Sequence, residues 1–204
     1  MTAIIGFACV ANAGSQSLQS LSPEAEARLL RGDLVISVWR DKSQSDNAIE
    51  VFGAIDIDAS AETIWALMLD CNRTMEIVTQ MTLCEVLEVA PDGSWDIRRQ
   101  KIKPGFLLPK STSVFRSDYD LPYHIKISLL GGDMKVQEGE WILTPIDTVK
   151  TRVSYRARLR PKFPIPNGLL KRGIRKDIPR VLKNLRTQSE QAQTKYIEPF
   201  GKPR

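Results

Sequence analysis

The chain has 204 residues, 42% of them hydrophobic, and a formal net charge of +5 with one histidine and three cysteines. A chain of this length and composition suits one domain with its own core. It contains no run of about eighteen apolar residues that would cross a membrane. One histidine argues against a zinc site, so we expect no metal. No phosphate loop or dinucleotide fingerprint is present, so we expect no cofactor either.

Positive charge is concentrated at the carboxyl-terminal end. Residues 150–204 contain sixteen Lys or Arg against three Asp or Glu, so the first 149 residues carry a net charge of −8. Such a polarised molecule can orient on an anionic surface, either lipid or nucleic acid. The alternative is a solvated helix face that has no partner.

The first thirteen residues are apolar and uncharged, and they end in Ala11-Asn12-Ala13, which has the form of a signal-peptidase site. The usual basic start of a signal is missing, but an apolar stretch before a polar linker has little other use. We therefore predict a signal peptide over 1–13 and a periplasmic or secreted protein. The alternative is a cytoplasmic protein in which this segment is not a signal.

Cleavage of that segment would remove Cys9 and leave Cys71 and Cys84, an even number that suits an oxidising compartment. A disulfide between them would close a loop of about fourteen residues and contribute on the order of 3 kcal/mol of stability. The alternative is two buried free thiols that behave as small hydrophobes.

Residues 14–47 are expected to form an N-terminal linker, a short helix and a strand. Ser22 followed by Pro23 is typical of a helix start, and Leu34–Trp39 alternates as a strand does. A larger domain follows over 48–190. It opens with a strand near 49–57, a helix over 61–70 and a second short helical segment before residue 80.

Six further strands are predicted in the remainder of this domain, because short turns such as Pro91-Asp92-Gly93 separate runs of alternating residues. Turns of this length leave no room for a helical crossover, so neighbouring strands must be antiparallel. The expected strands are 82–90, 95–103, 111–119, 122–130, 134–144 and 150–160.

A basic amphipathic helix begins after Asn167, and residues 191–204 are expected to form a C-terminal tail. The apolar face of this helix is buried if the sheet curls around it, which also encloses a cavity. A one-residue slip in 95–103 or 134–144 would turn a strand's inner face outward. The spacing of apolar residues predicts this ligand-binding wall: Trp65, Trp95, Ile97, Tyr123, Ile125, Ile127, Trp141, Tyr155, Leu170 and Ile174.

Alternate connections of a meander lie at the same end of its sheet. The connections 103–110, 131–133 and 162–167 should therefore meet at one mouth of the cavity. Loops seldom expose several large apolar groups without a reason, so we expect these either to fold back as a lid or to insert into a membrane. The expected mouth residues are Phe106, Leu107, Leu108, Phe163 and Ile165.

Four segments resemble a known superfamily: DASAETIWALMLD at 58–70, VFRSDY at 114–119, GEWIL at 139–143 and VSYRA at 153–157. They are similar to the polyketide cyclase and coenzyme Q-binding branch of the START/Bet v 1-like (SRPBCC) superfamily, over residues 48–190. The resemblance implies an α+β helix-grip fold with an apolar cavity for lipids, isoprenoids or polycyclic molecules. The superfamily has no universal catalytic residues, so none is carried over.

We expect the protein to bind, and to transport or sequester, a hydrophobic small molecule, with transient contact to an anionic membrane. No catalytic residue is identified: alternation places His124 on the outer face, and no nucleophile elbow or phosphate loop is present. A cyclase or dehydratase acting on a polyketide-like substrate is the alternative and would need an inward polar pair. Binding of RNA or ribosomes through the basic helix is a second alternative, against which the export signal argues. The oligomeric state is left open.

Overall fold

The computed structural model describes residues 21–40, 46–103 and 109–197. It begins with α1 (Pro23–Leu30) and β1 (Val35–Trp39), then β2 (Ile49–Ile57) and the helices α2 (Ala61–Leu69) and α3 (Cys71–Ile77). A meander follows, and one long helix, α4 (Asn167–Ile197), closes the fold. The strands of the meander are β3 (Met81–Val89), β4 (Trp95–Ile102), β5 (Ser111–Asp120), β6 (His124–Gly132), β7 (Met134–Pro145) and β8 (Thr151–Pro161).

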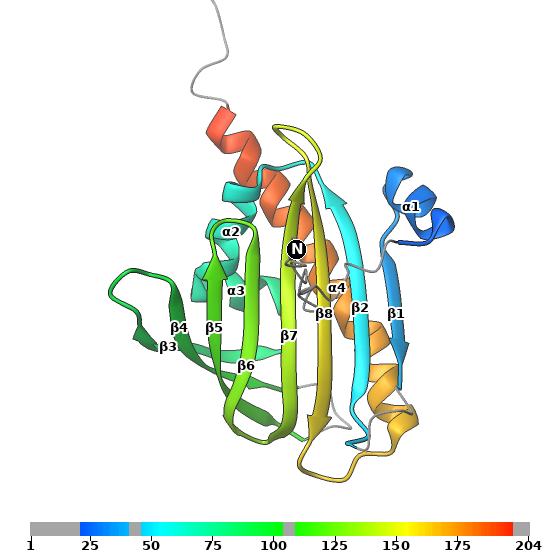
Figure 1. The fold of residues 1–204 in the computed structure, drawn as a ribbon, viewed down its shortest axis with the longest axis vertical. Helices are drawn as coiled ribbons and strands as arrows, with labels where there is room; N and C mark the ends of the chain where they lie inside the picture. Colours follow the sequence, from blue (N-terminus) through cyan, green and yellow to red (C-terminus); the bar gives the residue numbers. More distant parts are fainter. Residues whose placement is uncertain (1–20, 41–45, 104–108, 198–204) are drawn as a thin grey trace, which may run out of the picture.

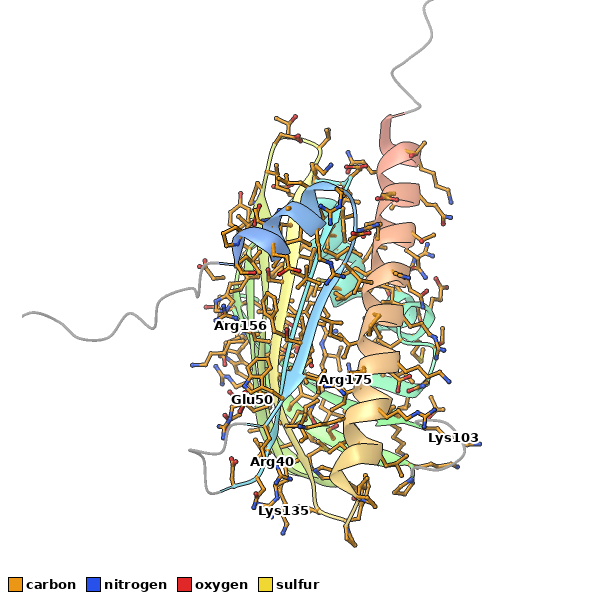
Figure 2. All side chains as sticks on the ribbon, turned by 90° about the vertical axis from the view of Figure 1, so that its right-hand side faces the viewer. Arg40, Glu50, Lys103, Lys135, Arg156 and Arg175 are labelled. Atoms are coloured by element: carbon orange, nitrogen blue, oxygen red, sulfur yellow. A yellow bond between two sulfur atoms is a disulfide. The ribbon has the colours of Figure 1, made fainter. Side chains whose placement is uncertain are left out.

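The strands form one eight-stranded sheet in the order β1-β2-β8-β7-β6-β5-β4-β3. Every neighbouring pair is antiparallel, and only the β2–β8 pair joins strands distant in sequence. The sheet is curved, and α4 lies along its concave side (Figure 1). Seen from the edge, sheet and helix form two layers (Figure 2). The predicted helix-grip fold is therefore confirmed.

The helix α4 packs closely against β2, at a place where the strand has no side chain. A Cβ atom at Gly53 would lie 3.0 Å from Cδ1 of Leu182. Leu182 and Leu185 join Ile55, Val153 and other inner-face residues in the main apolar core. The free space lies farther along the curve, between α3, α4 and the inner faces of β4 to β8.

Helix α1 and strand β1, which the sequence places before the main domain, extend the same sheet. Strand β1 pairs with β2, and Val38↔Val51 is one pair of the ladder. Arg152 on β8 fixes α1 from the outer face, because its guanidinium donates to Asp56 at 2.6 Å and to Glu26 at 2.7 Å. At the other end, α4 continues to Ile197, past residue 190, where the sequence places the start of a tail.

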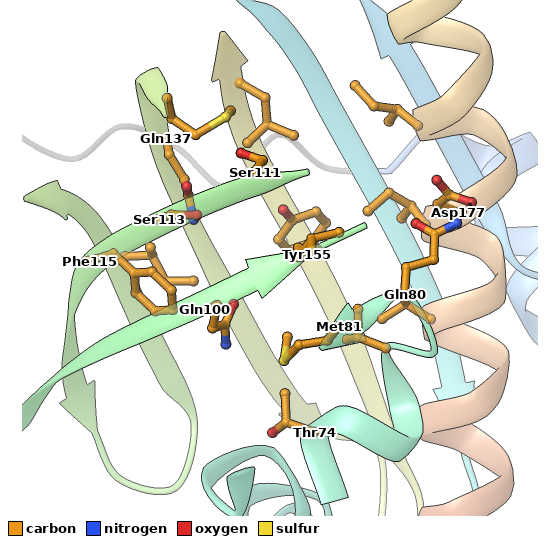
Figure 3. Close-up of a pocket in the computed structure, with 18 of the residues that line it drawn as sticks. Thr74, Gln80, Met81, Gln100, Ser111, Ser113, Phe115, Gln137, Tyr155 and Asp177 are labelled. Atoms are coloured by element: carbon orange, nitrogen blue, oxygen red, sulfur yellow. Dashed lines mark hydrogen bonds between the residues drawn. The ribbon is translucent and has the colours of Figure 1, made fainter. Parts of the chain in front are cut away.

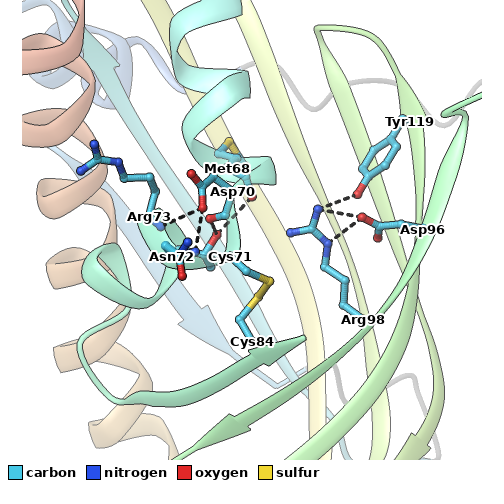
Figure 4. The surroundings of a disulfide bond; sticks show 10 residues. Met68, Asp70, Cys71, Asn72, Arg73, Cys84, Asp96, Arg98 and Tyr119 are labelled. Atoms are coloured by element: carbon cyan, nitrogen blue, oxygen red, sulfur yellow. Dashed lines mark hydrogen bonds and ion pairs between the residues drawn. A yellow bond between two sulfur atoms is a disulfide. The ribbon is translucent and has the colours of Figure 1, made fainter. Parts of the chain in front are cut away.

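The predicted disulfide between Cys71 and Cys84 is present, with the two Cα atoms 5.3 Å apart (Figure 4). It joins the first turn of α3 to β3. Asp70 caps the same turn, since its carboxylate accepts from the backbone N–H groups of Asn72 and Arg73. The short helix α3 is therefore held in place at its start, where helices of this length have little stability of their own. Within the described ranges, no helix is long and apolar enough to cross a membrane.

Candidate functional site

A cavity of about 370 Å³ lies between the inner face of the sheet, α3 and α4 (Figure 3). This volume falls within the range of small-molecule pockets. One side is formed by the end of α2, α3, the start of β3 and α4, and most of its residues are apolar. Its main residues are Met68, Leu69, Ile77, Val78, Met81, Leu170, Ile174, Ile178, Val181 and Leu185.

The strands β6, β7 and β8 supply a second wall, which is aromatic and aliphatic. Ile125 and Ile127 on β6 face the cavity beside Trp141 on β7 and Tyr155 on β8. The rings of Trp141 and Tyr155 pack with their centroids 4.4 Å apart. Flat apolar surface of this kind suits a ligand with a large hydrocarbon body.

The strands β4 and β5 supply a third wall, and this one is polar. Arg98, Gln100 and Ile102 on β4 alternate into the cavity. They stand opposite Phe115, Ser113 and Ser111 on β5, respectively. A polar stripe therefore runs along one wall, facing the apolar surface of α4.

Arg98 is buried and forms an ion pair with Asp96 (Figure 4). Its Nε donates to Oδ2 of Asp96 at 2.7 Å, and its Nη2 donates to the hydroxyl of Tyr119 at 3.3 Å. Desolvation by burial, the largest single effect, lowers the pKa of Arg98, but Asp96 and Tyr119 together outweigh it and raise that pKa above its ordinary value. Burial has the opposite effect on Tyr119 and raises its pKa. Arg98 and Asp96 therefore form a charged pair with a neutral phenol beside it.

Tyr155 is the second phenol of the cavity, and like Tyr119 it is partly buried. Desolvation raises its pKa to about 12, so the hydroxyl stays protonated at neutral pH. Among the described residues this hydroxyl has no hydrogen-bond partner. Because the hydroxyl lies in the lining of a mostly apolar cavity, a bound ligand can supply its missing partner.

Six of the ten predicted wall residues line the cavity: Ile125, Ile127, Trp141, Tyr155, Leu170 and Ile174. The prediction for Trp95 and Ile97 is wrong, because β4 has the opposite register and turns them to the outer face. There the guanidinium of Arg116 lies 4.3 Å above the Trp95 ring. The prediction put the apolar residues of this strand inside. In the structure the charged residues are inside, and their burial is tolerated because Asp96 and Arg98 form an ion pair.

Trp65 and Tyr123 were also predicted at the wall, and neither lines the cavity. Trp65 is buried in the core and packs edge-on against Tyr119, with ring centroids 5.6 Å apart. Tyr123 is 44% exposed, because β6 starts only at His124 and Tyr123 belongs to the preceding turn.

Of the predicted mouth residues, Phe163 and Ile165 line the cavity, and Phe106, Leu107 and Leu108 lie outside the described residues. Pro109, Met134 and Pro161 also line it. Pro109, Phe163 and Ile165 belong to two of the connections that the sequence assigned to one end of the sheet, and Met134 and Pro161 are the strand residues next to them. The cavity therefore reaches that end, which is the lower end in Figure 1.

Sequence reasoning missed the polar wall and one polar contact across the cavity's edge. Gln80, in the turn before β3, donates to Asp177 of α4 at 2.9 Å, and both residues line the cavity (Figure 3). The available signal was the spacing Asp96-x-Arg98-x-Gln100, in which opposite charges two residues apart share one face of a strand.

His124 lies on the outer face, where its Nε2 is 3.0 Å from the Glu140 carboxylate. Glu138 is on the same face and accepts from Arg158 at 2.9 Å. Neither glutamate lines the cavity. Within the described ranges, no three His, Cys, Asp or Glu side chains are grouped as a metal site would require.

Residues 57–186 match the model of the family described as "Polyketide cyclase / dehydrase and lipid transport". No curated protein sequence matches the chain. Solved structures with the same fold include a STAR-related lipid transfer protein from Xanthomonas axonopodis, with a TM-score of 0.65 and 16% identity over 78% of this chain and 94% of that one. A START superfamily protein from Mycobacterium smegmatis has a TM-score of 0.61 and 20% identity, over 70% and 97% of the two chains. The Zhui aromatase/cyclase from Streptomyces sp. R1128 has a TM-score of 0.59 and 15% identity, over 75% and 98%.

Proposed function

Because the chain belongs to the polyketide cyclase/dehydrase and lipid transport family, we propose that it binds a hydrophobic small molecule in the cavity and transports or sequesters it. The observation that carries this proposal is the open space of about 370 Å³ between apolar residues of α4 and of the sheet. A core without a ligand-binding role is packed with few voids larger than a water molecule. Filling the space with an apolar ligand would remove this surface from water.

Displacement of a fluorescent apolar probe tests this function. Ile127→Trp adds bulk on the inner face of β6 and should lower probe affinity by about tenfold or more, since overfilled sites force side chains out of their preferred positions. Leu130→Trp is the matched control, because Leu130 is on the same strand but 55% exposed. Equal binding by the two variants, both folded, would place the ligand elsewhere.

We also propose that the mouth docks on anionic lipid. Lysines surround this end of the fold, and Lys103 and Lys135 are seen there in Figure 2. The connections at the opposite end carry exposed acids instead: Asp58, Asp70, Asp92, Asp120 and Asp147. A molecule with charge separated in this way turns its basic end towards a negative surface.

Vesicle sedimentation tests the docking. Binding to vesicles with phosphatidylglycerol should exceed binding to phosphatidylcholine alone and weaken with salt. Lys162→Glu with Lys135→Glu should reduce it, whereas Lys150→Glu should not, because Lys150 lies at the opposite end beside Asp58, at 3.1 Å. Preference for RNA over these vesicles in direct competition would favour the nucleic-acid alternative.

Export is part of the same proposal, because a disulfide is stable in an oxidising compartment. The mature protein is expected to begin at Gly14 and to carry the bridge between Cys71 and Cys84. Intact-mass measurement on protein isolated from its own cells checks both points. A mass that includes residues 1–13, or two free thiols in the isolated protein, would contradict export.

A cyclase or dehydratase is the second candidate function. Arg98, which is buried, and the partly buried Tyr119 favour it, because their N–H and O–H groups can donate hydrogen bonds to a carbonyl oxygen inside an apolar site and so polarise it. Incubation with a linear poly-β-ketone thioester should then give a cyclised product that Arg98→Lys forms more slowly. An unchanged rate of product formation in Arg98→Lys would contradict the cyclase candidate and leave binding as the only supported function.

A further inference from the structure

Every charged side chain that lines the cavity within residues 21–40, 46–103 and 109–197 has a partner of opposite charge. Arg98 is paired with Asp96 at 2.7 Å. Asp177 accepts from Gln80 and lies 3.7 Å from Arg180, which lines the edge of the same space. In the described lining each charge therefore has an opposite charge beside it, and none is left unbalanced for an ionised carboxylate, phosphate or amine.

The remaining polar groups of the lining are neutral. Gln100 and Ser113 stand opposite one another across β4 and β5, and Figure 3 shows Ser111 and Gln137 near Ser113. None of these four side chains, nor the Tyr155 hydroxyl, has a hydrogen-bond partner among the described residues. Amides and hydroxyls both donate and accept, so they fit alcohol, ketone or ester oxygens.

An anionic group that reaches Arg98 meets a guanidinium whose charge Asp96 already balances. Only one oxygen of Asp96 is paired, since its Oδ1 is buried without a partner in the described structure. A second carboxylate would meet this uncompensated oxygen and lose its own hydration. Displacing Asp96 would instead leave a buried carboxylate without its counter-charge. Both outcomes are strongly unfavourable in a low-dielectric interior.

On the premise of the proposed function, we infer that the cavity accepts an uncharged, oxygen-bearing hydrophobic molecule and rejects its ionised counterparts. The hydrocarbon part lies against α4 and the aromatic wall of β6 to β8. The hydroxyl, carbonyl or ester oxygens face the stripe formed by Gln100, Ser113 and their neighbours on β4 and β5. Neutral alcohols, ketones and esters are the ligand class, and ionised fatty acids and phosphates are excluded from the interior.

Three ten-carbon probes of matched length test the inference on the unmodified protein: decan-1-ol, methyl decanoate and decanoate at pH 8, each displacing a fluorescent apolar dye. The alcohol and the ester should bind at least about tenfold more tightly than the carboxylate, because only the carboxylate brings an unpaired charge into the cavity. Equal or tighter binding of decanoate overturns the inference and leaves the proposed function standing. Failure of all three probes and the dye to bind overturns the proposed function itself.

Two matched substitutions extend the test. Asp96→Asn removes the counter-charge of Arg98 and should shift the preference towards decanoate by about tenfold, since a free guanidinium binds carboxylates strongly. Asp118→Asn removes the same group from the Arg116–Asp118 pair, whose contact is 2.6 Å and whose side chains are 38% and 42% exposed. It should leave the preference unchanged. An equal shift in the two folded variants would show that Asp96 does not set the charge of the cavity, and would contradict the inference.

Discussion

Two ion pairs of the same spacing occur on neighbouring strands, one on each face of the sheet. Asp96 and Arg98 on β4 face inward, and their side chains are each 6% exposed. Arg116 and Asp118 on β5 face outward and are partly solvated. A solvated pair contributes about 0–1 kcal/mol to stability, whereas removing one partner of a buried pair costs about 3–5 kcal/mol. An Asp–Arg pair therefore contributes little on the outer face, whereas on the inner face it affects both the stability of the fold and the charge of the cavity.

A second group of charges on the outer face, centred on Arg158, is partly solvated like the Arg116–Asp118 pair. Arg158 reaches Asp46, Glu50 and Glu138 within 3.0 Å, and its guanidinium remains partly in water. Such networks tolerate substitution because solvent screens each charge. Solvent screens the buried Asp96 and Arg98 much less, so a change of charge there must be balanced by a neighbour or a ligand.

The largest expected effect breaks the inner pair. Arg98→Met leaves Asp96 buried without its counter-charge and should lower the free energy of unfolding by about 3–5 kcal/mol. Arg116→Met, its outer counterpart, should change it by less than about 1 kcal/mol. Urea unfolding followed by circular dichroism measures both. Comparable losses of unfolding free energy in the two variants would contradict the proposed difference between the inner and the outer ion pair.

The disulfide is a second feature of the inner side, because it holds α3 and α3 forms part of the cavity wall. Cys71→Ser with Cys84→Ser should cost on the order of 3 kcal/mol through the greater freedom of the unfolded chain. Probe affinity should fall as well, since Thr74, Ile77 and Val78 of this segment line the cavity. Thermal unfolding and probe titration measure the two effects. A loss of stability with unchanged affinity would show that α3 keeps its position without the bridge.

The smallest expected effect concerns the pH dependence of the inner wall. Because the pKa of Tyr155 is raised to about 12 in the folded protein, its stabilising contribution is complete below its ordinary pKa near 10. It is lost as the pH rises from about 10 to about 12, by up to about 1.4 kcal/mol per pH unit. Tyr155→Phe should unfold with a shallower dependence in this window. An identical alkaline profile for both proteins would mean that the phenol is not desolvated.

Alternation in the sequence was sufficient to predict which residues face the cavity wherever the apolar residues of a strand all lie on its inner face. On β6 and β8, Ile125, Ile127 and Tyr155 were placed correctly because polar residues separate them. On β4 the pattern was ambiguous: Trp95 and Ile97 lie outside, and Asp96 and Arg98 lie inside. Reading that strand required knowing that the two charges neutralise one another and that Arg116 covers Trp95, and both contacts depend on the tertiary structure.

The helices show the same limit. The apolar stripe of α2 correctly places Trp65 in the interior, but spacing alone does not distinguish the packed core from the wall of the cavity. That distinction depends on where α4 meets the sheet, and the absent side chain at Gly53 contributes to this contact. The polar wall residues Gln100 and Ser113 gave no signal of their own, since such residues are equally common on exposed strands.

The most direct measurement of the central claim is native mass spectrometry of the protein isolated from its own cells, followed by extraction and identification of what is bound. We expect one uncharged hydrophobic molecule per chain, retained by Leu130→Trp and absent from Ile127→Trp. A protein that carries no ligand in any form, or one that keeps its ligand when Ile127→Trp fills the cavity, would contradict the assignment of the cavity as the binding site.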